Sequence, residues 1–226
     1  MAIANIVGLT LDNAITKAGA SYSIGNPAAT TVTNSRGEGT TDYTLPMFAF
    51  NTGGVIPAGS TINSATLTLR LTAWFAGEPT AVFDKHLVVA VQKDFLAFGA
   101  VVNAVAGDYD WAASNLMQDY LVTEALGTKT FVLPAAAFSR IATAADIDVP
   151  DTNPEKNGWT EVSIIDQSDT TTGFLVLIWT WAAADHGTPS FRPTLIVNYT
   201  PPAGGGKARV IPAFAIPRPR MAGANL

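Results

Sequence analysis

Residues 56–72 read IPAGSTINSATLTLRLT, and the pattern in this stretch is the strongest indication of the fold. Pro57 and Gly59 favour a turn at its start. After the turn, apolar and polar residues alternate. The apolar positions are Ala65, Leu67, Leu69 and Leu71, and the polar positions between and after them are Thr66, Thr68, Arg70 and Thr72. Alternation with a period of two predicts a β-strand that has one buried side and one solvent-facing side.

A second strong strand is predicted near the other end of the chain. Residues 191–200 read FRPTLIVNYT, a run rich in β-branched and aromatic residues that is followed by two prolines. We expect this strand and the first one to belong to a single β unit whose ends return to one another. Further strands are predicted at 6–11, 43–51, 86–93, 128–133, 159–165 and 173–181. So many short strands with few helices favour a two-sheet sandwich.

Four of these stretches together resemble the DNRLRE-type β-sandwich domains, a family related to jelly-roll carbohydrate-binding modules. The stretches are LPMFAFN at 45–51, IPAGSTINSATLTLRLT at 56–72, GFLVLIWTW at 173–181 and FRPTLIVNYT at 191–200. The residues that match the two end motifs of the family are Ile56, Pro57, Gly59, Ile62, Ser64, Ala65, Leu67, Leu69, Arg192, Pro193, Leu195, Val197 and Tyr199. The resemblance covers residues 42–200. It implies a fold and leaves the function open.

The connecting segments are predicted from their turn and cap residues. Residues 18–41 are rich in Ser, Thr, Asn and Gly, and they are predicted to form a long loop or irregular arm. Pro46 cannot donate to a β-ladder, so its strand is expected at a sheet edge or to begin there. Residues 134–145 are predicted to form a helix with Pro134 at its first position.

The sequence therefore predicts an all-β, jelly-roll-like antiparallel β-sandwich with one or two short helices and an extended C-terminal arm. Residues 1–41 are expected to add a strand and a long loop to the sandwich, and residues 42–202 to form its core. Residues 203–226 are expected to form a Gly-hinged, Pro-rich arm.

Composition limits the classes of function. The chain has 226 residues, of which 48% are hydrophobic and 14% are charged, and it has no cysteine. The apolar composition indicates burial against partners, although a well-filled, alanine-rich sandwich explains it equally well. The absence of cysteine excludes a disulfide framework and thiol chemistry.

The distribution of charge and of apolar runs bears on partners and location. Four basic residues and no acidic ones lie in 203–226, so the remainder of a chain with net charge −5 is the more acidic part. An acidic sandwich argues against nucleic acid as a partner. Residues 1–19 lack the features of a secretory signal, and no apolar run is long enough to span a membrane. A lectin-like fold without an export signal is typical of a virus particle made in the host cytoplasm.

The C-terminal arm is the first candidate binding segment. Its prolines forbid a continuous helix, and its apolar residues cannot form a core alone. We expect it to dock on a neighbouring subunit or on its own sandwich. The candidate partner-binding residues are Lys207, Arg209, Val210, Ile211, Phe214, Ile216, Arg218, Arg220 and Met221.

Two further sites are candidates for small ligands. Asp146, Asp148, Asp151 and Asn153 could supply oxygen ligands to calcium, or they could be a solvated acidic loop; no other cofactor is expected. Trp74, Trp159 and Trp181 could stack on a glycan, or they could fill the ends of the sandwich. Catalytic motifs such as G-x-S-x-G and H-E-x-x-H are absent from the sequence, so we do not expect an enzyme.

These features together favour a virion structural protein, most specifically a capsid decoration (cement) protein of a bacteriophage. It would bind the major capsid protein and copies of itself and would form a homo-oligomer. A tail or fibre component is the alternative in the same class. A carbohydrate-binding module that recognises cell-surface glycan is the alternative from another class.

Overall fold

The fold is all-β, as the sequence predicts. The computed structural model describes residues 1–8, 13–18, 21–24, 30–36, 43–76, 86–93, 116–121, 125–147, 158–166 and 177–203. The strands are β1 (Ala2–Val7), β2 (Asn13–Ala18), β3 (Ser21–Ile24), β4 (Thr31–Arg36), β5 (Tyr43–Phe50), β6 (Thr61–Ala76), β7 (His86–Lys93), β8 (Leu116–Leu121), β9 (Gly127–Val132), β10 (Thr160–Asp166), β11 (Leu177–Ala182) and β12 (Thr194–Thr200). Three short 3-10 helices are η1 (Ala135–Arg140), η2 (Ala144–Asp146) and η3 (Pro189–Phe191). Each pair of neighbouring strands is antiparallel.

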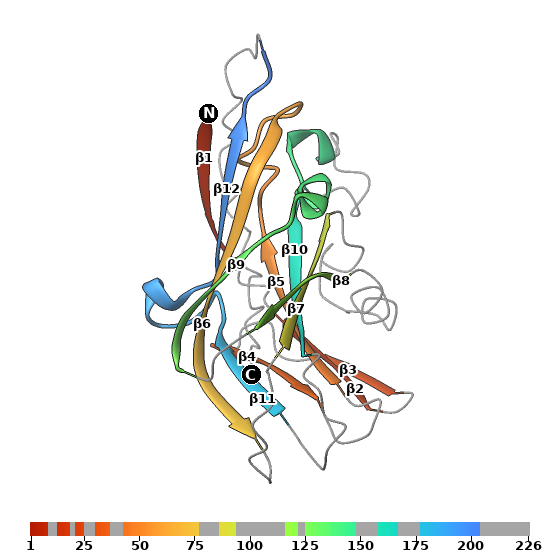
Figure 1. The fold of residues 1–226 in the computed structure, drawn as a ribbon, viewed down its shortest axis with the longest axis vertical. Coiled ribbons are helices and arrows are strands. Elements are labelled where there is room, and N and C mark those ends of the chain that lie inside the picture. Colours follow the sequence, from red (N-terminus) through yellow and green to blue (C-terminus); the bar gives the residue numbers. More distant parts are fainter. Residues whose placement is uncertain are drawn as a thin grey trace, which may run out of the picture.

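Strand β6 is the centre of the architecture and runs through most of the length of the molecule (Figure 1). Its first half pairs with β12, with Leu67 opposite Leu195, and its last part pairs with β11. Thr66 and Thr68 pair with both β12 and β9, so these two strands lie on opposite sides of β6. The pairing of β6 with β12 confirms that the two strong strands of the sequence belong to one β unit.

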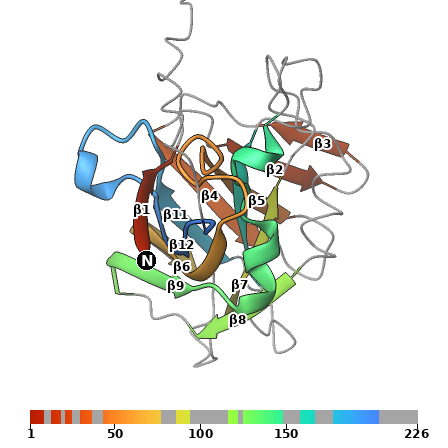
Figure 2. The ribbon, with the colours of Figure 1, turned by 90° about the horizontal axis from the view of Figure 1, so that it is seen from above.

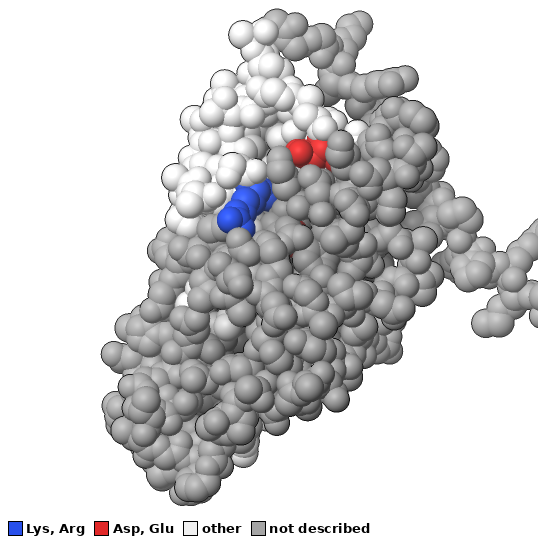
Figure 3. All heavy atoms as spheres, turned by 90° about the vertical axis from the view of Figure 1, so that its right-hand side faces the viewer, with Lys and Arg blue, Asp and Glu red and all other residues white. Residues whose placement is uncertain are grey.

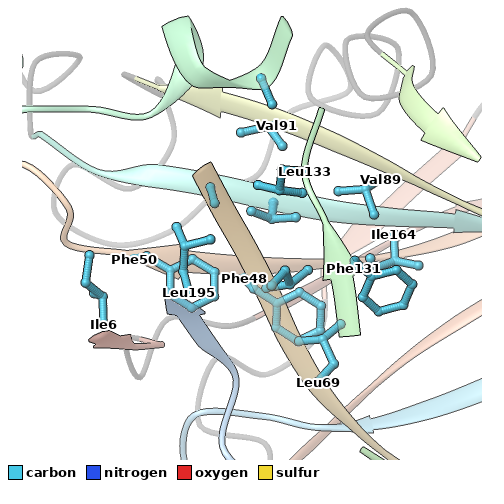
Figure 4. Close-up of a cluster of buried hydrophobic side chains, with 14 of the residues drawn as sticks. Ile6, Phe48, Phe50, Leu69, Val89, Val91, Phe131, Leu133, Ile164 and Leu195 are labelled. Carbon is cyan, nitrogen blue, oxygen red and sulfur yellow. The ribbon is translucent and has the colours of Figure 1, made fainter. Parts of the chain in front are cut away.

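The strands follow the path β1-β12-β6-β11-β4-β5-β10-β7-β8, and this sheet folds over on itself to enclose a core. Viewed along the long axis, β1, β12 and β6 lie on one side and β5, β7 and β8 on the other (Figure 2). Figure 4 shows side chains of β6, β9 and β12 meeting those of β5, β7 and β10. The largest fully buried side chains are Trp179, Trp181, Phe48, Phe50, Phe131, Ile56, Leu67, Leu69, Leu71, Leu87 and Ile164. The alternation of residues 65–72 is therefore confirmed, because the four apolar positions point into this core.

Two β-bulges change which side chains of β6 point towards the core. Asn63 has no residue opposite it in the pairing with β12, and Thr72 has none in the pairing with β11. An extra residue in one strand of a pair reverses the facing of the residues beyond it. Beyond Thr72, the strand therefore turns Trp74 towards the core, where it packs partly buried, and leaves Phe75 58% exposed. The Thr72 hydroxyl donates to the Thr180 carbonyl at 3.0 Å and ties the second bulge to β11.

The prediction of a long loop at 18–41 is wrong, because this segment contains β3 and β4. Strand β4 pairs along its whole length with β11, from Arg36 opposite Leu177 to Thr31 opposite Ala182. Its sequence, TVTNSR, is polar enough to suggest a loop. The backbone of β11 supplies the ladder that makes it a strand, and Val32 adds one buried side chain to the core.

The prediction that Pro46 marks an edge strand or the start of a strand is also wrong, because β5 begins at Tyr43 and has neighbours on both sides. On one side β5 pairs with β2, and on the other it pairs with β4 at 43–44 and with β10 at 47–50. Pro46 lies between these last two ladders. Its carbonyl accepts a hydrogen bond from the Ser163 hydroxyl at 3.0 Å. A residue without an N–H is tolerated there because neither ladder pairs with it.

The predicted helix at 134–145 is two short 3-10 turns rather than one continuous helix. Ala135–Arg140 forms the first turn, and Pro134 is its N-cap. Thr143 then begins η2, and the Asp146 carboxylate accepts from the Thr143 backbone N–H at 2.7 Å. Phe138 and Ile141 are three residues apart, a spacing that suits a 3-10 turn as well as an α-helix.

A buried polar junction holds these turns to the end of the sandwich. The Thr160 hydroxyl lies 2.6 Å from the Thr52 hydroxyl and accepts a hydrogen bond from the Ala142 N–H at 2.8 Å. The Gly53 N–H donates to the Gly158 carbonyl at 2.7 Å. Buried polar groups need such partners, so the junction fixes where three separate segments meet.

Tyr120 connects β8 to β9 and gives the fold a pH dependence. Its hydroxyl donates to the Val132 carbonyl, its ring makes an edge contact with Phe131 at 5.1 Å, and burial raises its pKa to about 12. An unfolded tyrosine titrates near pH 10, so the folded state holds the proton more tightly. The stability from this group is present below about pH 10 and is lost as the pH rises towards about 12.

We therefore expect Tyr120→Phe to lose less stability than the parent chain between about pH 8 and about pH 11. Urea unfolding of both proteins at the two pH values measures the difference. Equal losses in the two proteins would show that Tyr120 does not titrate differently on unfolding.

Candidate interaction surface

A broad, almost uncharged surface covers the side of β1, β12, β6 and β9 that faces away from the core. We call this the outer face. The residues that alternate with the core positions of these strands form it, namely Ile3, Asn5, Val7, Thr194, Ile196, Asn198, Ser64, Thr66, Thr68, Arg70, Thr128, Thr130 and Val132. The register places Asn5, Ile196, Thr66 and Val132 in one row across the four strands. Ile3, Val132 and Val7 are exposed by 70%, 59% and 50%.

Arg70 is the one charged residue of the outer face. Its guanidinium lies over the Phe191 ring, 4.4 Å from the centroid, and Phe191 also contacts His186 at 5.1 Å. The Arg192 side chain donates to the His186 carbonyl at 3.1 Å and holds this turn in place. Lys129 belongs to the other face of β9, where partial burial lowers its pKa. The outer face thus has no carboxylate, and an aromatic ring covers its one cation.

The predicted glycan platform is not assembled. The prediction that Trp181 stacks on a glycan is wrong, because its side chain is fully buried. It stacks on Trp179, with ring centroids 6.3 Å apart and planes inclined by 15°, and Trp179 contacts Trp74 at 6.4 Å. Trp159 is half-buried and adjoins Thr160 at the polar junction, at the opposite end of β6 from Trp74. The bulge at Thr72 is the physical reason that Trp74 turns inwards rather than outwards.

The predicted calcium site falls largely outside the described residues. Asp148, Asp151 and Asn153 lie outside them, and Asp146 uses its Oδ2 atom to accept hydrogen bonds from the backbone N–H and the hydroxyl of Thr143. Where the chain is described, no group of three or more His, Cys, Asp or Glu side chains is placed to hold a metal. The partner-binding residues predicted in the arm also lie outside the described part.

A groove that the sequence did not predict lies between η1, η2 and the start of β6. Its volume is about 460 Å³, and its lining is mostly hydroxyl and apolar: Ser60, Thr61, Ile62, Phe138, Ser139, Ile141, Thr143, Ala145 and Asp146. The Ser60 hydroxyl is buried there and makes no hydrogen bond within the described part of the chain. Figure 3 shows the side of the molecule to the right in Figure 1, where basic and acidic atoms of the described residues are visible as two separate spots. No sequence pattern signals this groove, because its two halves meet only through tertiary packing.

Comparison with protein-family models gives no match, and comparison with curated proteins gives none either. The resemblance to DNRLRE-type domains thus stays a prediction. In the described residues, no helix has the length and apolar character needed to cross a membrane.

Proposed function

We propose that this chain is a non-enzymatic structural protein that binds other protein subunits through the outer face. The observation that carries the proposal is the combination of exposed Ile3, Val7 and Val132 with threonines and a single cation. An antiparallel sheet that faces water alone usually alternates apolar residues inside with polar and charged residues outside. Interface centres, in contrast, are depleted of charge. The outer face therefore has the composition of an interface centre and not that of a solvent-facing sheet.

Electrostatics supports the same role. The whole chain has a net charge of −5, and none of the residues that form the outer face is acidic. A subunit can approach this face without like-charge repulsion from acidic groups, while acidic groups elsewhere keep the protein soluble. The threonine side chains offer both a methyl group and a hydroxyl, so they suit a contact that is partly apolar and partly hydrogen-bonded.

Within the structural class, we propose a virion protein, most specifically a bacteriophage capsid decoration (cement) protein. Its partners would be the major capsid protein and copies of itself. The support is the sequence: a resemblance to a sandwich family used in attachment, and a Gly-hinged arm that could reach a neighbour. A tail or fibre component is the alternative in this class. The hydroxyl-lined groove with Phe138 favours a carbohydrate-binding module as the alternative outside it.

Immunogold labelling tests this proposal. An antibody raised against the purified chain would be applied to virus particles from the source of this sequence, and to intact host cells incubated with the chain. We expect gold on the shell of the particle. Gold confined to tails or fibres would replace decoration with the tail role. Labelled cells without labelled particles would favour the carbohydrate-binding module, and no labelling of particles would overturn the virion role.

A further inference from the structure

Strand β1 ends the described path of the sheet and leaves one edge without a strand partner among the described residues (Figure 1). The Gly8 N–H donates to the Pro193 carbonyl at 2.9 Å, and the register continues from this pair to Ala2 opposite Tyr199. In an antiparallel ladder, the residues that bond to one neighbour alternate with those that point away. The even-numbered residues of β1 therefore bond to β12, and the N–H and C=O groups of Ile3, Asn5 and Val7 point outwards from the sheet.

Within the described part of the chain, this edge has none of the features that protect edge strands. Native edges are commonly blunted by Lys, by Pro, by a bulge or by a covering segment. Residues 1–8 read MAIANIVG, with no charge and no proline, and the pairing with β12 is regular throughout. Ile3 and Val7 are exposed by 70% and 50%, so their side chains remain uncovered. An edge of this kind is a template for another strand.

We propose that β1 pairs antiparallel with β1 of a second copy, with Asn5 facing its own counterpart on a two-fold axis. In a symmetric antiparallel pair, the two-fold axis passes between two copies of the same residue. Centring the pair on Asn5 sets Ile3 opposite Val7 of the partner and uses all of the outward backbone groups. Shifting the axis to Ala4 sets Asn5 opposite Ile3 and Val7 opposite Met1 of the partner, and shifting it to Ile6 sets Asn5 opposite Val7 and places Ile3 beyond the end of the partner's β1. The register centred on Asn5 is thus the one that pairs the polar residue with itself and the two β-branched residues with each other.

The outer face gives a second reason for a copy of this chain as the partner. The pairing joins the outer faces of the two copies into one continuous surface, and neither face has a carboxylate to repel the other. An interface that uses the same patch on both subunits is the commonest arrangement in homodimers. The inference deepens the proposed structural role and rests on its use of this surface for subunit contact, but it requires no virus particle.

Disulfide trapping tests the register directly, because the chain has no cysteine of its own. Residues that exchange hydrogen bonds across an antiparallel pair have Cα atoms about 5.5 Å apart, which lies within the range of about 4.4–6.8 Å that a disulfide spans. We expect Asn5→Cys to form a covalent dimer on mild oxidation, measured by non-reducing electrophoresis and intact mass. The control is Thr130→Cys, an exposed position of the outer face on β9, which should remain a monomer. The reverse result, with Thr130→Cys linked and Asn5→Cys unlinked, would overturn edge pairing in favour of face-to-face stacking.

Sedimentation equilibrium of the chain without added cysteine gives an independent measurement. We expect a dimer whose dissociation constant rises at least tenfold in Ile3→Lys, because a lysine would lie against Val7 of the partner. Leu126→Lys replaces an apolar residue that is 59% exposed and lies outside the outer face, and it should leave the dissociation constant unchanged. A chain that is monomeric at every concentration and unlinked at position 5 would refute the pairing. The immunogold experiment tests the virion role, and its result does not depend on whether this dimer forms.

Discussion

Trp181→Ala should lower the free energy of unfolding by about 3–5 kcal/mol, the usual cost of truncating a buried aromatic side chain. Trp181 is fully buried and stacks on Trp179 at 6.3 Å. It also makes an edge contact with the Phe131 ring at 6.3 Å, so it joins β11 to β9 over the buried face of β6. The substitution leaves a cavity that rigid strands on both sides cannot close. Urea unfolding followed by far-UV circular dichroism measures the loss.

Phe75→Ala is the matched control for this prediction. Phe75 lies on β6, next to β11, but it is 58% exposed because the bulge at Thr72 turns it outwards. Its truncation should change the free energy of unfolding by no more than about 0.5 kcal/mol. If both variants lost the same stability, the face assignment beyond Thr72 would be wrong.

Gly53→Ala is expected to cost about 1–3 kcal/mol, the range for forcing extra atoms into a packed site. A Cβ atom at Gly53 would lie 2.7 Å from the Gly158 carbonyl oxygen and 2.9 Å from the Thr143 carbonyl oxygen. Both obstacles are backbone atoms that cannot rotate away. The clash would also separate the Gly53 N–H from the Gly158 carbonyl that accepts its hydrogen bond at 2.7 Å.

The control here is Gly187→Ala, which introduces the same methyl group where no atom beyond the two neighbouring residues lies within 4 Å. This variant should be neutral or slightly stabilised, since alanine restricts the unfolded chain. Thermal unfolding of the two variants and the parent separates the effects. A parent-like midpoint for Gly53→Ala would mean that the junction can open without cost and does not fix the turns.

Local patterns in the sequence determined much of the fold. The alternation at 65–72 defines the buried side of β6, and the apolar runs at 86–93 and 191–200 indicate β7 and β12. Each of these signals depends only on residues that are close in the chain and on the two-residue repeat of a strand. The resulting prediction of an antiparallel β-sandwich is confirmed.

What the sequence could not determine depends on contacts between distant segments. The polar stretch TVTNSR becomes β4 because β11 supplies its hydrogen-bond ladder, and Pro46 is accepted inside the sheet because two partner strands meet there. Trp74 turns towards the core because a partner strand skips one residue of β6. A bulge is a property of a pair of strands, so a single strand's periodicity cannot reveal it.

The candidate surfaces also combine features that the sequence predicts with features that depend on the tertiary structure. The sequence by itself determined that Thr66, Thr68 and Arg70 share the solvent-facing side of one strand. The tertiary structure alone shows that β1, β12 and β9 extend this side into the outer face, and that β1 ends the path of the described strands. The hydroxyl groove likewise exists only because residues 60–62 pack beside residues 138–146. Alternation along one strand is local, whereas the neighbours of that strand are chosen by long-range pairing and by the packing of the core.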